Sequence, residues 1–502
     1  MSVHQVLPKH GVAREQLRER GQFWTPNWVA EAMVAYVSNG NAREIFDPAV
    51  GVGAFFHAAK NIESEIGRKL GLFGNEIDAS VLQQSLTTGL QQADLAGVRI
   101  QDFTSFKPQN LLPAIVANPP YIRHHRLSAE TKVYLRRLSR EILGFSLDGR
   151  TGYHVYFLIH ALNLLAEFGR LAFIIPADTF EGIFAHKLWH WITCHYRLDA
   201  VVTFDPAASP FPHVDTNAVI VLIKKAPPQN RLWWARVNKP EGEELKRWVL
   251  SNFETPKCNS IAIHDRSLAE AIRTGLSRSP QEEIHAGPIL GDYAKVLRGI
   301  ATGANEFFFL TRKQAADISV PDTYLLPAIG RTRDVETDII TAETMQRLDL
   351  KGRPTLLLSI DGRPETSLPI TLQNYLSLGK ELDLPNRALI KTRRPWYKME
   401  VRDAPPILFA YLGRRNVRFI RNKVDAMPLT GFLCVYPHYH NEEFIEQLWQ
   451  VLQHPETIKN LAKVGKSYGS GAIKVEPRAL EKLPLPEPIV QRIGLLPTKL
   501  FS

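Results

Sequence analysis

The chain has 502 residues, more than one compact core usually holds, so roughly two or three domains are expected. Its composition, 44% hydrophobic and 22% charged, is typical of a globular protein, and no stretch approaches the roughly 20 apolar residues of a membrane helix. The N-terminal segment lacks the apolar core of a secretion signal, which predicts a cytoplasmic protein. Lys and Arg number 61 against 51 Asp and Glu, a net charge of +10 that suits a polyanionic partner.

The sequence gives no indication of a metal site or a disulfide framework. Cys194, Cys258 and Cys434 lie far apart and form no CxxC pair. His124 and His125 are adjacent, but no carboxylate or cysteine accompanies them at ligand spacing. We therefore predict a protein without a metal cofactor.

The first half of the chain alternates short β-rich segments with helical patterns, which is typical of βαβ units and a parallel sheet. Thr25-Pro26 predicts an N-cap followed by proline at the first helical position. Further helices are expected from about Ala54 and over Tyr153 to Glu167. Strands are expected at Glu44 to Phe46, Leu72 to Ile77, Val98 to Gln101, Ala114 to Ala117, Arg170 to Ile175, Ala200 to Phe204 and Asn217 to Ile223. These segments predict an open, doubly wound α/β domain with a mostly parallel, seven-stranded sheet.

A charged, proline-containing run, Lys224 to Asn230, interrupts this pattern, so a domain boundary is expected near residue 225. The predicted domains are residues 1–225 and 226–502. The second half loses the regular alternation and contains basic and aromatic clusters, Lys391 to Lys398 and Tyr411 to Arg418, in what we expect to be a mixed α+β domain.

A glycine-bearing loop, Asp47-Pro48-Ala49-Val50-Gly51-Val52-Gly53, lies between the first predicted strand and the following helix. Glycines there let the backbone turn tightly beside a ligand at the carboxyl edge of the sheet. The spacing departs from the GxGxxG dinucleotide motif, because Phe56 stands three residues after Gly53. The acidic residue at the start of the loop would repel a pyrophosphate and could accept hydrogen bonds from an ammonium group or hydroxyls. A cationic, phosphate-free nucleoside therefore fits better than NAD.

Carboxylates also follow the next two strands. Glu76 ends the second strand, where such folds place a ribose-binding acid, and Asp102-Phe103 follows the third. Asp102 offers an acceptor for an adenine amino group and Phe103 a ring to pack beside the base. Taken singly, Glu76 and Asp102 are also compatible with solvated strand ends, and Phe103 with a core position. Their occurrence at successive strand ends favours the functional interpretation.

The fourth predicted strand runs directly into Asn118-Pro119-Pro120-Tyr121. The two prolines remove two backbone donors and stiffen the turn, which leaves the Asn118 side-chain oxygen and a backbone carbonyl as fixed acceptors. Two acceptors suit an NH₂ group. Hydrogen bonds to both N–H groups would favour a pyramidal nitrogen and prepare it for attack on a sulfonium methyl, a catalysis by positioning and preorganisation. Tyr121 supplies an aromatic face for a base removed from a helix stack. The structural alternative is a proline-rich turn with a surface tyrosine.

The order of these motifs resembles the γ-class N6-adenine DNA methyltransferases, in particular the branch with the Thermus aquaticus enzyme and the Eco57I-like methylases. Gly21 to Pro26 is similar to that family's N-terminal cofactor motif. The resemblance implies the class I S-adenosylmethionine-dependent fold, and Glu76 on the cofactor's ribose and Asp102 on its adenine. The implied cofactor contacts are Thr25, Asp47, Pro48, Ala49, Val50, Glu76, Asp102, Phe103 and Pro120, and the implied catalytic set is Asn118, Pro119, Tyr121 and Phe211.

Phe211, in Ser209-Pro210-Phe211-Pro212, is similar to the family's second base-stacking residue; the alternative is a buried loop phenylalanine. The second half resembles the family's DNA target-recognition domain at Arg298 to Asn305, Arg394 to Tyr397 and Tyr468 to Lys474. Cations there and after the motif tyrosine could contact phosphates, although a solvated basic surface explains them equally well. The candidate DNA-binding residues are Arg123, Arg126, Arg394, Trp396, Arg414 and Arg415.

The function predicted from these residues is methylation of N6 of a flipped-out adenine in double-stranded DNA with S-adenosylmethionine, as part of a restriction-modification system and with a nucleoid-associated location. A separately encoded restriction endonuclease is the expected further partner. One alternative is a protein glutamine methyltransferase, because glutamine also presents an NH₂ group. Another is a DNA-binding subunit with a vestigial methylase domain. The four motif residues recognise only an amino group, so the choice of DNA depends on the second half of the chain and on the resemblance.

Overall fold

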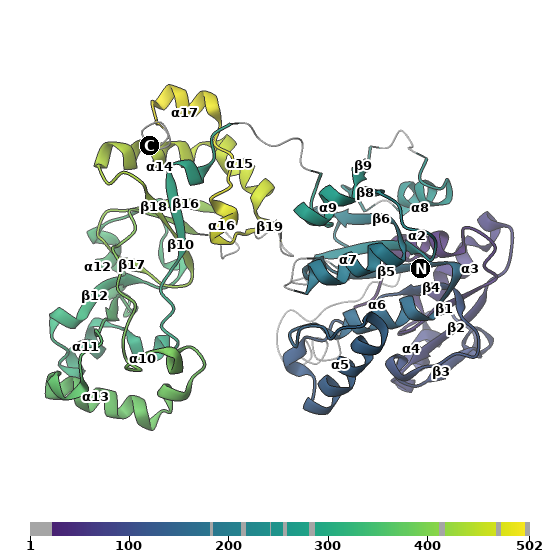
Figure 1. The fold of residues 1–502 in the computed structure, drawn as a ribbon, viewed down its shortest axis with the longest axis horizontal. Coiled ribbons are helices and arrows are strands. Elements are labelled where there is room, and N and C mark those ends of the chain that lie inside the picture. The colour runs from purple at the N-terminus through teal and green to yellow at the C-terminus, as the bar shows by residue number, and fades with distance from the viewer. Residues whose placement is uncertain are drawn as a thin grey trace. The chain divides into compact units, whose positions relative to one another are not determined.

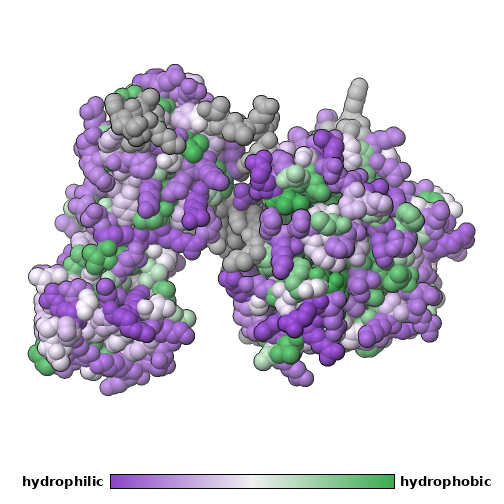
Figure 2. Space-filling model, in the orientation of Figure 1, coloured by the Kyte–Doolittle hydropathy of each residue, from purple (hydrophilic) through white to green (hydrophobic). Residues whose placement is uncertain are grey.

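The computed structural model describes residues 23–180, 184–211, 217–240, 242–254, 259–280, 287–410, 417–467 and 473–496. The chain divides into two compact units, residues 1–281 and 282–502 (Figure 1). On the face drawn in Figure 2, hydrophilic residues cover most of the visible surface of each unit. Smaller groups of hydrophobic residues lie among these hydrophilic residues. Among the described residues, no helix is long and apolar enough to cross a bilayer.

The first unit is built on a nine-stranded sheet with the order β3-β2-β1-β4-β5-β7-β6-β8-β9. Seven strands run parallel, and β7 and β9 run antiparallel to them. The strands are β1 (Glu44–Asp47), β2 (Gly71–Glu76), β3 (Val98–Ile100), β4 (Leu112–Ala117), β5 (Leu165–Pro176), β6 (Arg197–Phe204), β7 (Ala218–Lys224), β8 (Arg231–Val237) and β9 (Ile261–Ser267). All seven strands expected from the sequence are present, but the prediction of a seven-stranded sheet was wrong, because β8 and β9 extend it.

Helices cover both faces of this sheet, as Figure 1 shows. They are α2 (Asn27–Ser38), α3 (Ala54–Ile66), α4 (Ala79–Thr87), α5 (Ala129–Leu143), α6 (Tyr153–Leu164), α7 (Ala185–His195), α8 (Gly242–Leu250) and α9 (Leu268–Thr274). Alternate residues of the central strands face opposite layers. Val116 and Ile174 pack with α2, α3 and α8, whereas Ile115 and Phe173 pack with α6 and α7. This alternation is the two-residue period of a strand buried on both sides.

Two predicted boundaries of elements shift in the structure. Pro26 is the N-cap of α2 rather than its first helical residue, so the Thr25 hydroxyl is not used to cap the helix. Helix α6 ends at Leu164 instead of Glu167, and β5 begins at once because Leu165 already pairs with Leu112 of β4.

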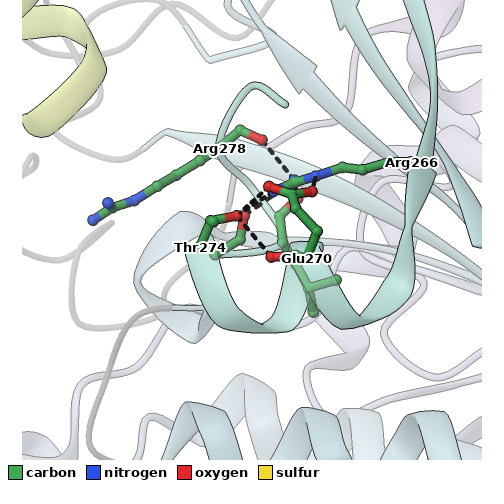
Figure 3. Close-up of polar contacts among 6 residues, drawn as sticks. Arg266, Glu270, Thr274 and Arg278 are labelled. Carbon is green, nitrogen blue, oxygen red and sulfur yellow. Dashed lines mark hydrogen bonds and ion pairs between the residues drawn. The ribbon is translucent and has the colours of Figure 1, made fainter. Parts of the chain in front are cut away.

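The boundary expected near residue 225 lies within the first unit. The charged run after β7 is only the connection to β8, which pairs in parallel with β6 and continues the sheet. The end of the unit is then anchored by Arg266 of β9, which forms an ion pair with Glu270 of α9 (Figure 3). Its guanidinium also donates to the Thr274 hydroxyl and to the backbone carbonyl of Arg278. The chain is thus held in the first unit as far as residue 278, which explains a division at 281 rather than 225.

The second unit combines short helices with two larger sheets. One sheet has the order β10-β18-β15-β16-β13 and the other β11-β14-β12-β17. Their strands are β10 (Ala294–Arg298), β11 (Phe309–Leu310), β12 (Leu325–Ile329), β13 (Ile339–Ile340), β14 (Leu356–Leu358), β15 (Ile407–Ala410), β16 (Arg418–Asn422), β17 (Met427–Pro428) and β18 (Phe432–Pro437); β19 (Lys466–Ser467) pairs with β20 (Ile473–Lys474). The helices are α10 (Asn305–Phe308), α11 (Arg312–Ile318), α12 (Ala342–Leu350), α13 (Ile370–Glu381), α14 (Glu442–Gln453), α15 (Pro455–Val464), α16 (Pro477–Leu480) and α17 (Glu487–Ile493).

Candidate active site

A cavity of about 460 Å³ opens at the carboxyl edge of β1, β2, β3 and β4. Its size is within the usual range for a small-molecule site. It is lined by Phe23, Trp24, Thr25, Pro48, Ala49, Val50, Gly51, Val52, Ala54, Phe55, Glu76, Ile77, Asp78, Val81, Gln101, Asp102, Phe103, Asn118, Pro120, Ile122, Tyr153 and Phe157. Every cofactor residue expected from the sequence is in this lining except Asp47.

The charge of the lining indicates the kind of ligand that fits. Three carboxylates face the cavity, from Glu76, Asp78 and Asp102, and no Lys or Arg is among the described residues that line it. A pyrophosphate would meet only like charge there, whereas a cationic nucleoside would meet opposite charge and hydroxyl acceptors. The residues present therefore fit S-adenosylmethionine, which carries a sulfonium, an ammonium and a ribose, better than they fit a dinucleotide.

The loop after β1 is held in shape by hydrogen bonds from its own amides to neighbouring carboxylates. The amide of Ala49 donates to Asp47 Oδ1 at 2.9 Å, and that of Gly51 donates to Glu76 Oε2 at 2.8 Å. Gly53 has a φ of 81°, and a Cβ there would lie 2.3 Å from the Leu90 side chain, so glycine is required. The amides of Ala49, Val50 and Gly51 are thus engaged within the protein, and the loop lines the cavity with Pro48, Ala49, Val50, Gly51 and Val52.

Asp47 lies behind this loop rather than in the cavity. It is fully buried, and its Oδ2 has no hydrogen-bond partner among the described residues. Burial raises the pKa of its carboxyl group to about 8, and the hydrogen bond from Ala49 opposes that shift only in part. The structure thus gives Asp47 a role in shaping the loop, and a direct contact with a ligand stays a prediction.

Glu76 combines a structural role with a place in the cavity. Its Oε1 accepts from the amides of Ile77 and Asp78 at 2.9 and 3.0 Å, in addition to the Gly51 contact of Oε2. A carboxylate has about four lone-pair positions, so capacity remains for a hydroxyl donor. Ile77 beside it is 70% exposed and lines the cavity. It was not singled out from the sequence, although an apolar residue directly after a strand-end carboxylate was an available signal.

Asp102 is positioned by groups from two elements. Its Oδ1 accepts from the Thr104 amide at 2.8 Å, and the Tyr153 hydroxyl donates to Oδ1 and Oδ2 at 3.1 and 3.0 Å. Burial, together with the charge of Asp102, raises the pKa of Tyr153, which keeps its hydroxyl protonated as a donor. Tyr153 begins α6 and lies fifty-one residues away in sequence, so sequence spacing gave no indication of this contact. Phe103 is 1% exposed and packs on Phe157 at 5.2 Å between ring centroids.

The amide of Asn118 has a defined orientation. Its Nδ2 donates to the Phe23 carbonyl at 2.6 Å and to Thr25 Oγ1 at 3.2 Å. Both acceptors come from the segment before α2, ninety-five and ninety-three residues away. Because Nδ2 is engaged, Oδ1 is the atom that remains for a donor from a substrate. Asn118 and Pro120 line the cavity, whereas Pro119 is buried beside them.

Three aromatic side chains, those of Phe23, Tyr121 and Phe211, pack against one another near this asparagine. The ring centroid of Phe23 lies 5.9 Å from Tyr121 and 6.0 Å from Phe211. Tyr121 and Phe211 are 6.4 Å apart and meet edge to face at 84°, so in this structure they contact each other and do not form two parallel walls. Phe211 is only 4% exposed, which is the buried position that the structural alternative described. Its stacking on a base stays a prediction that requires rotation of the ring.

The Tyr121 hydroxyl donates to the Ile174 carbonyl at 3.0 Å, and burial raises the pKa of this phenol. The residue as a whole retains intermediate exposure. Phe23 was not among the predicted site residues. It lies in the predicted cofactor motif, but its contact with the motif tyrosine depends on tertiary packing.

The candidate DNA-binding residues are distributed unevenly. Arg123 and Arg126 are exposed in and beside the short 3₁₀ turn η3 (His124–Arg126), directly after the motif tyrosine. Arg394 is exposed in the second unit, and its Nη1 donates to the Lys391 carbonyl. Arg414 and Arg415 lie outside the described residues. Trp396 packs with Phe307, Phe308 and Tyr397 in the apolar core of the second unit. This packing explains why an aromatic residue occupies position 396 without requiring that it contacts DNA.

Metal binding has no support in the described part of the chain, where no group of three His, Cys, Asp or Glu side chains is arranged to hold an ion.

Comparisons with known protein families give a separate match for each half of the chain. Residues 9–254 match the N-6 DNA Methylase family, and residues 280–497 match the C-terminal domain of type II methyltransferase M.Eco57I. The first unit is thus similar to N-6 DNA methylases. The first match ends at residue 254 and the second begins at residue 280, close to residue 281, where the structure divides.

Relatives extend over nearly the whole chain. Type II methyltransferase M.AccI of Acinetobacter calcoaceticus is 24% identical over 479 residues, covering 94% of this chain and 86% of the relative. M.XamI of Xanthomonas campestris pv. amaranthicola is 24% identical over 485 residues, covering 93% of this chain and 85% of the relative.

Solved structures with a similar fold are larger proteins. The type IIG restriction endonuclease BpuSI has a TM-score of 0.50 and 17% identity over 97% of this chain, and the chain spans 62% of its length. The type IIL restriction-modification enzyme MmeI, solved in complex with DNA, has a TM-score of 0.51 and 11% identity over 96% of this chain and 73% of its own. The methyltransferase-like α/β fold is therefore shared with restriction-modification enzymes.

Proposed function

We propose that this protein is a site-specific DNA methyltransferase that transfers a methyl group from S-adenosylmethionine to N6 of a flipped-out adenine in double-stranded DNA. The observation that carries the proposal is the Asn118 amide. Its nitrogen is held by Phe23 and Thr25, so its oxygen is left to accept beside a cavity with three carboxylates and no lining cation. A site of this kind accepts an NH₂ group next to a cationic ligand.

The cofactor part of the proposal assigns roles to the carboxylates. Glu76 would accept from ribose hydroxyls, and Asp102, held by Tyr153, would accept from the adenine amino group of the cofactor. Bound S-adenosylmethionine would supply an electrophilic methyl group. Thr25, Pro48, Ala49, Val50, Phe103 and Pro120 line the same cavity and would contact the cofactor there.

The chemical step would depend on positioning. Asn118 Oδ1 and a backbone carbonyl of the Asn118–Tyr121 turn would accept from the two N–H groups of the target, which favours a pyramidal, more nucleophilic nitrogen. Pro119 keeps the turn rigid. Tyr121 would stack on the extruded base, and Phe211 would follow if its ring rotates away from Tyr121. No covalent intermediate with the protein is required.

The relatives favour DNA as the substrate. M.AccI and M.XamI are type II methyltransferases, which favours DNA over a protein as the substrate. The match of residues 280–497 to the M.Eco57I C-terminal domain supports a place in the γ class and its Eco57I-like branch. We further propose that this second unit recognises the target sequence, and that a restriction endonuclease encoded separately cleaves the unmodified site.

Methyl transfer to duplex DNA tests this proposal directly. Purified protein, S-adenosylmethionine with a labelled methyl group and a plasmid are expected to give label in N6-methyladenine after digestion of the DNA to nucleosides. Label on cytosine or only on protein would refute the assignment. Single-molecule sequencing of DNA from cells that express the protein would then give the modified sequence.

A further inference from the structure

His154, the second residue of α6, contacts the motif tyrosine. Its ring centroid lies 5.9 Å from that of Tyr121, with the planes at 70°, so the two rings meet edge to face. The Tyr121 hydroxyl is fixed separately by the Ile174 carbonyl at 3.0 Å. Tyr121 is therefore restrained at its hydroxyl end and along its ring.

His154 is itself held by a rigid neighbour. Its Nε2 lies 2.8 Å from Thr179 Oγ1, in the short 3₁₀ turn η4 (Ala177–Phe180) that follows β5. The Thr179 carbonyl accepts from Trp189 Nε1 at 3.0 Å, and Phe180 stacks on Trp189 at 4.6 Å. The turn is thus anchored to α7, and the imidazole cannot rotate without breaking a buried hydrogen bond.

The local sequence makes room for this ring. A Cβ at Gly152 would lie 2.6 Å from His154 Cε1, so a larger residue there would displace the imidazole. Burial also lowers the pKa of His154 to about 3, which keeps the ring neutral at any ordinary assay pH.

Stability alone does not explain a histidine at this position. The side chain is 6% exposed, and Nδ1 is without a hydrogen-bond partner among the described residues. A buried polar atom without a partner costs free energy compared with an apolar ring of similar size. His154 offsets this cost through its ring contact with Tyr121 and the contact of its Nε2 with Thr179.

We propose that His154 is a positioning residue that fixes the ring plane of Tyr121, so that the stacking face for an extruded base exists before DNA binds. This inference rests on the proposed function. A stacking ring that is already ordered loses less conformational freedom on binding, so the base binds more tightly.

The adjacent residue gives a matched control. Tyr153 lies one position earlier on α6 and contacts Asp102 in the cofactor cavity, whereas His154 contacts Tyr121. Tyr153→Phe should therefore weaken S-adenosylmethionine binding without changing base stacking, and His154→Ala should do the reverse.

The test uses the full-length protein and a duplex with 2-aminopurine at the target adenine, in the sequence that the single-molecule sequencing gives. Emission of this base rises when it leaves the helix stack and is quenched when it stacks on an aromatic ring. For His154→Ala we expect higher emission than for wild type, roughly tenfold lower kcat/KM for DNA, and an S-adenosylmethionine Kd within about twofold of wild type. His154→Phe, which keeps an aromatic edge, should restore the quenched emission.

Several results would overturn the role of His154. These are a His154→Ala signal and kcat/KM equal to wild type, or equal losses of cofactor and DNA parameters in the His154→Ala and Tyr153→Phe variants. If His154→Ala does not fold, His154→Leu, which has an apolar side chain and lacks an aromatic edge, must raise emission above wild type; no rise contradicts the proposal. Failure of wild type to methylate DNA would refute the proposed function instead, which separates the two outcomes.

Discussion

The two units use similar residue types in different ways. In the first, the functional candidates stand at the ends of strands and line one cavity. Glu76 is the last residue of β2, Asp102 lies two residues after β3, and Asn118 directly follows β4. In the second, the basic and aromatic segment around Trp396 contributes its indole to the core and its Arg394 to the surface. Strand ends in a parallel sheet converge by construction, whereas a loop places its side chains only through packing.

Arg393 illustrates the same difference. Its guanidinium donates to the carbonyls of Ala301 and Thr302 at 2.7 and 2.8 Å and lies 5.7 Å from the centre of the Phe308 ring. An arginine of the basic cluster Lys391 to Lys398 is here part of the internal structure. A basic segment therefore identifies a region and not the individual residues that bind.

The largest effect is expected at the convergent site. Asn118→Ala should lower kcat for methyl transfer by at least about 10²-fold, because one preorganised hydrogen-bonding group is commonly worth that much. Equilibrium dialysis should still detect S-adenosylmethionine binding. Full activity in this variant would remove the central role of Asn118 and, with it, the contrast between the two units.

Asp47 should give the next largest effect, through pH. Its carboxyl has a pKa of about 8 in the folded chain and roughly 4 when unfolded, so the folded state binds the proton more tightly. The free energy of unfolding should then fall as pH rises between these values, by up to about 1.4 kcal/mol per pH unit. Asp47→Asn should reduce this slope while keeping an acceptor for the Ala49 amide. Urea unfolding of both proteins at a series of pH values measures it, and equal slopes would contradict the prediction.

Two neighbouring substitutions should separate stability from DNA binding in the second unit. Trp396→Ala should destabilise the unit by roughly 2 kcal/mol, since it removes a partly buried aromatic ring that packs against a core. Arg394→Ala should leave thermal stability unchanged and weaken DNA binding. Thermal unfolding and a fluorescence binding assay of each variant separate these effects. A stable Trp396→Ala protein with lost DNA binding would show that the indole, too, faces DNA.

The smallest effect is expected at the edge of the first unit. Arg123 is exposed directly after the turn, and Arg123→Ala should lower the slope of log K against log salt by about one if it contacts a phosphate. Arg150→Ala is the matched control, because Arg150 is paired with Asp148 at 2.8 Å. A change in slope for Arg150→Ala as large as that for Arg123→Ala would indicate general electrostatics in place of a specific contact.

Seven of the nine strands of the first unit, the glycine loop and the Asn118–Tyr121 turn could be predicted from the sequence alone. Runs of apolar, β-branched residues specify buried parallel strands, and the order of strand ends then places the cofactor residues at one edge. These are consequences of local pattern and of a topology with few alternatives.

Only the tertiary structure decided which groups restrain that site. Phe23, Tyr153 and His154 act on Asn118, Asp102 and Tyr121 across separations of thirty-three to ninety-five residues. The extension of the sheet by β8 and β9 and the burial of Trp396 were likewise decided by pairing and packing. Contacts between distant segments depend on how whole layers pack, and a single sequence carries no periodic signal for them.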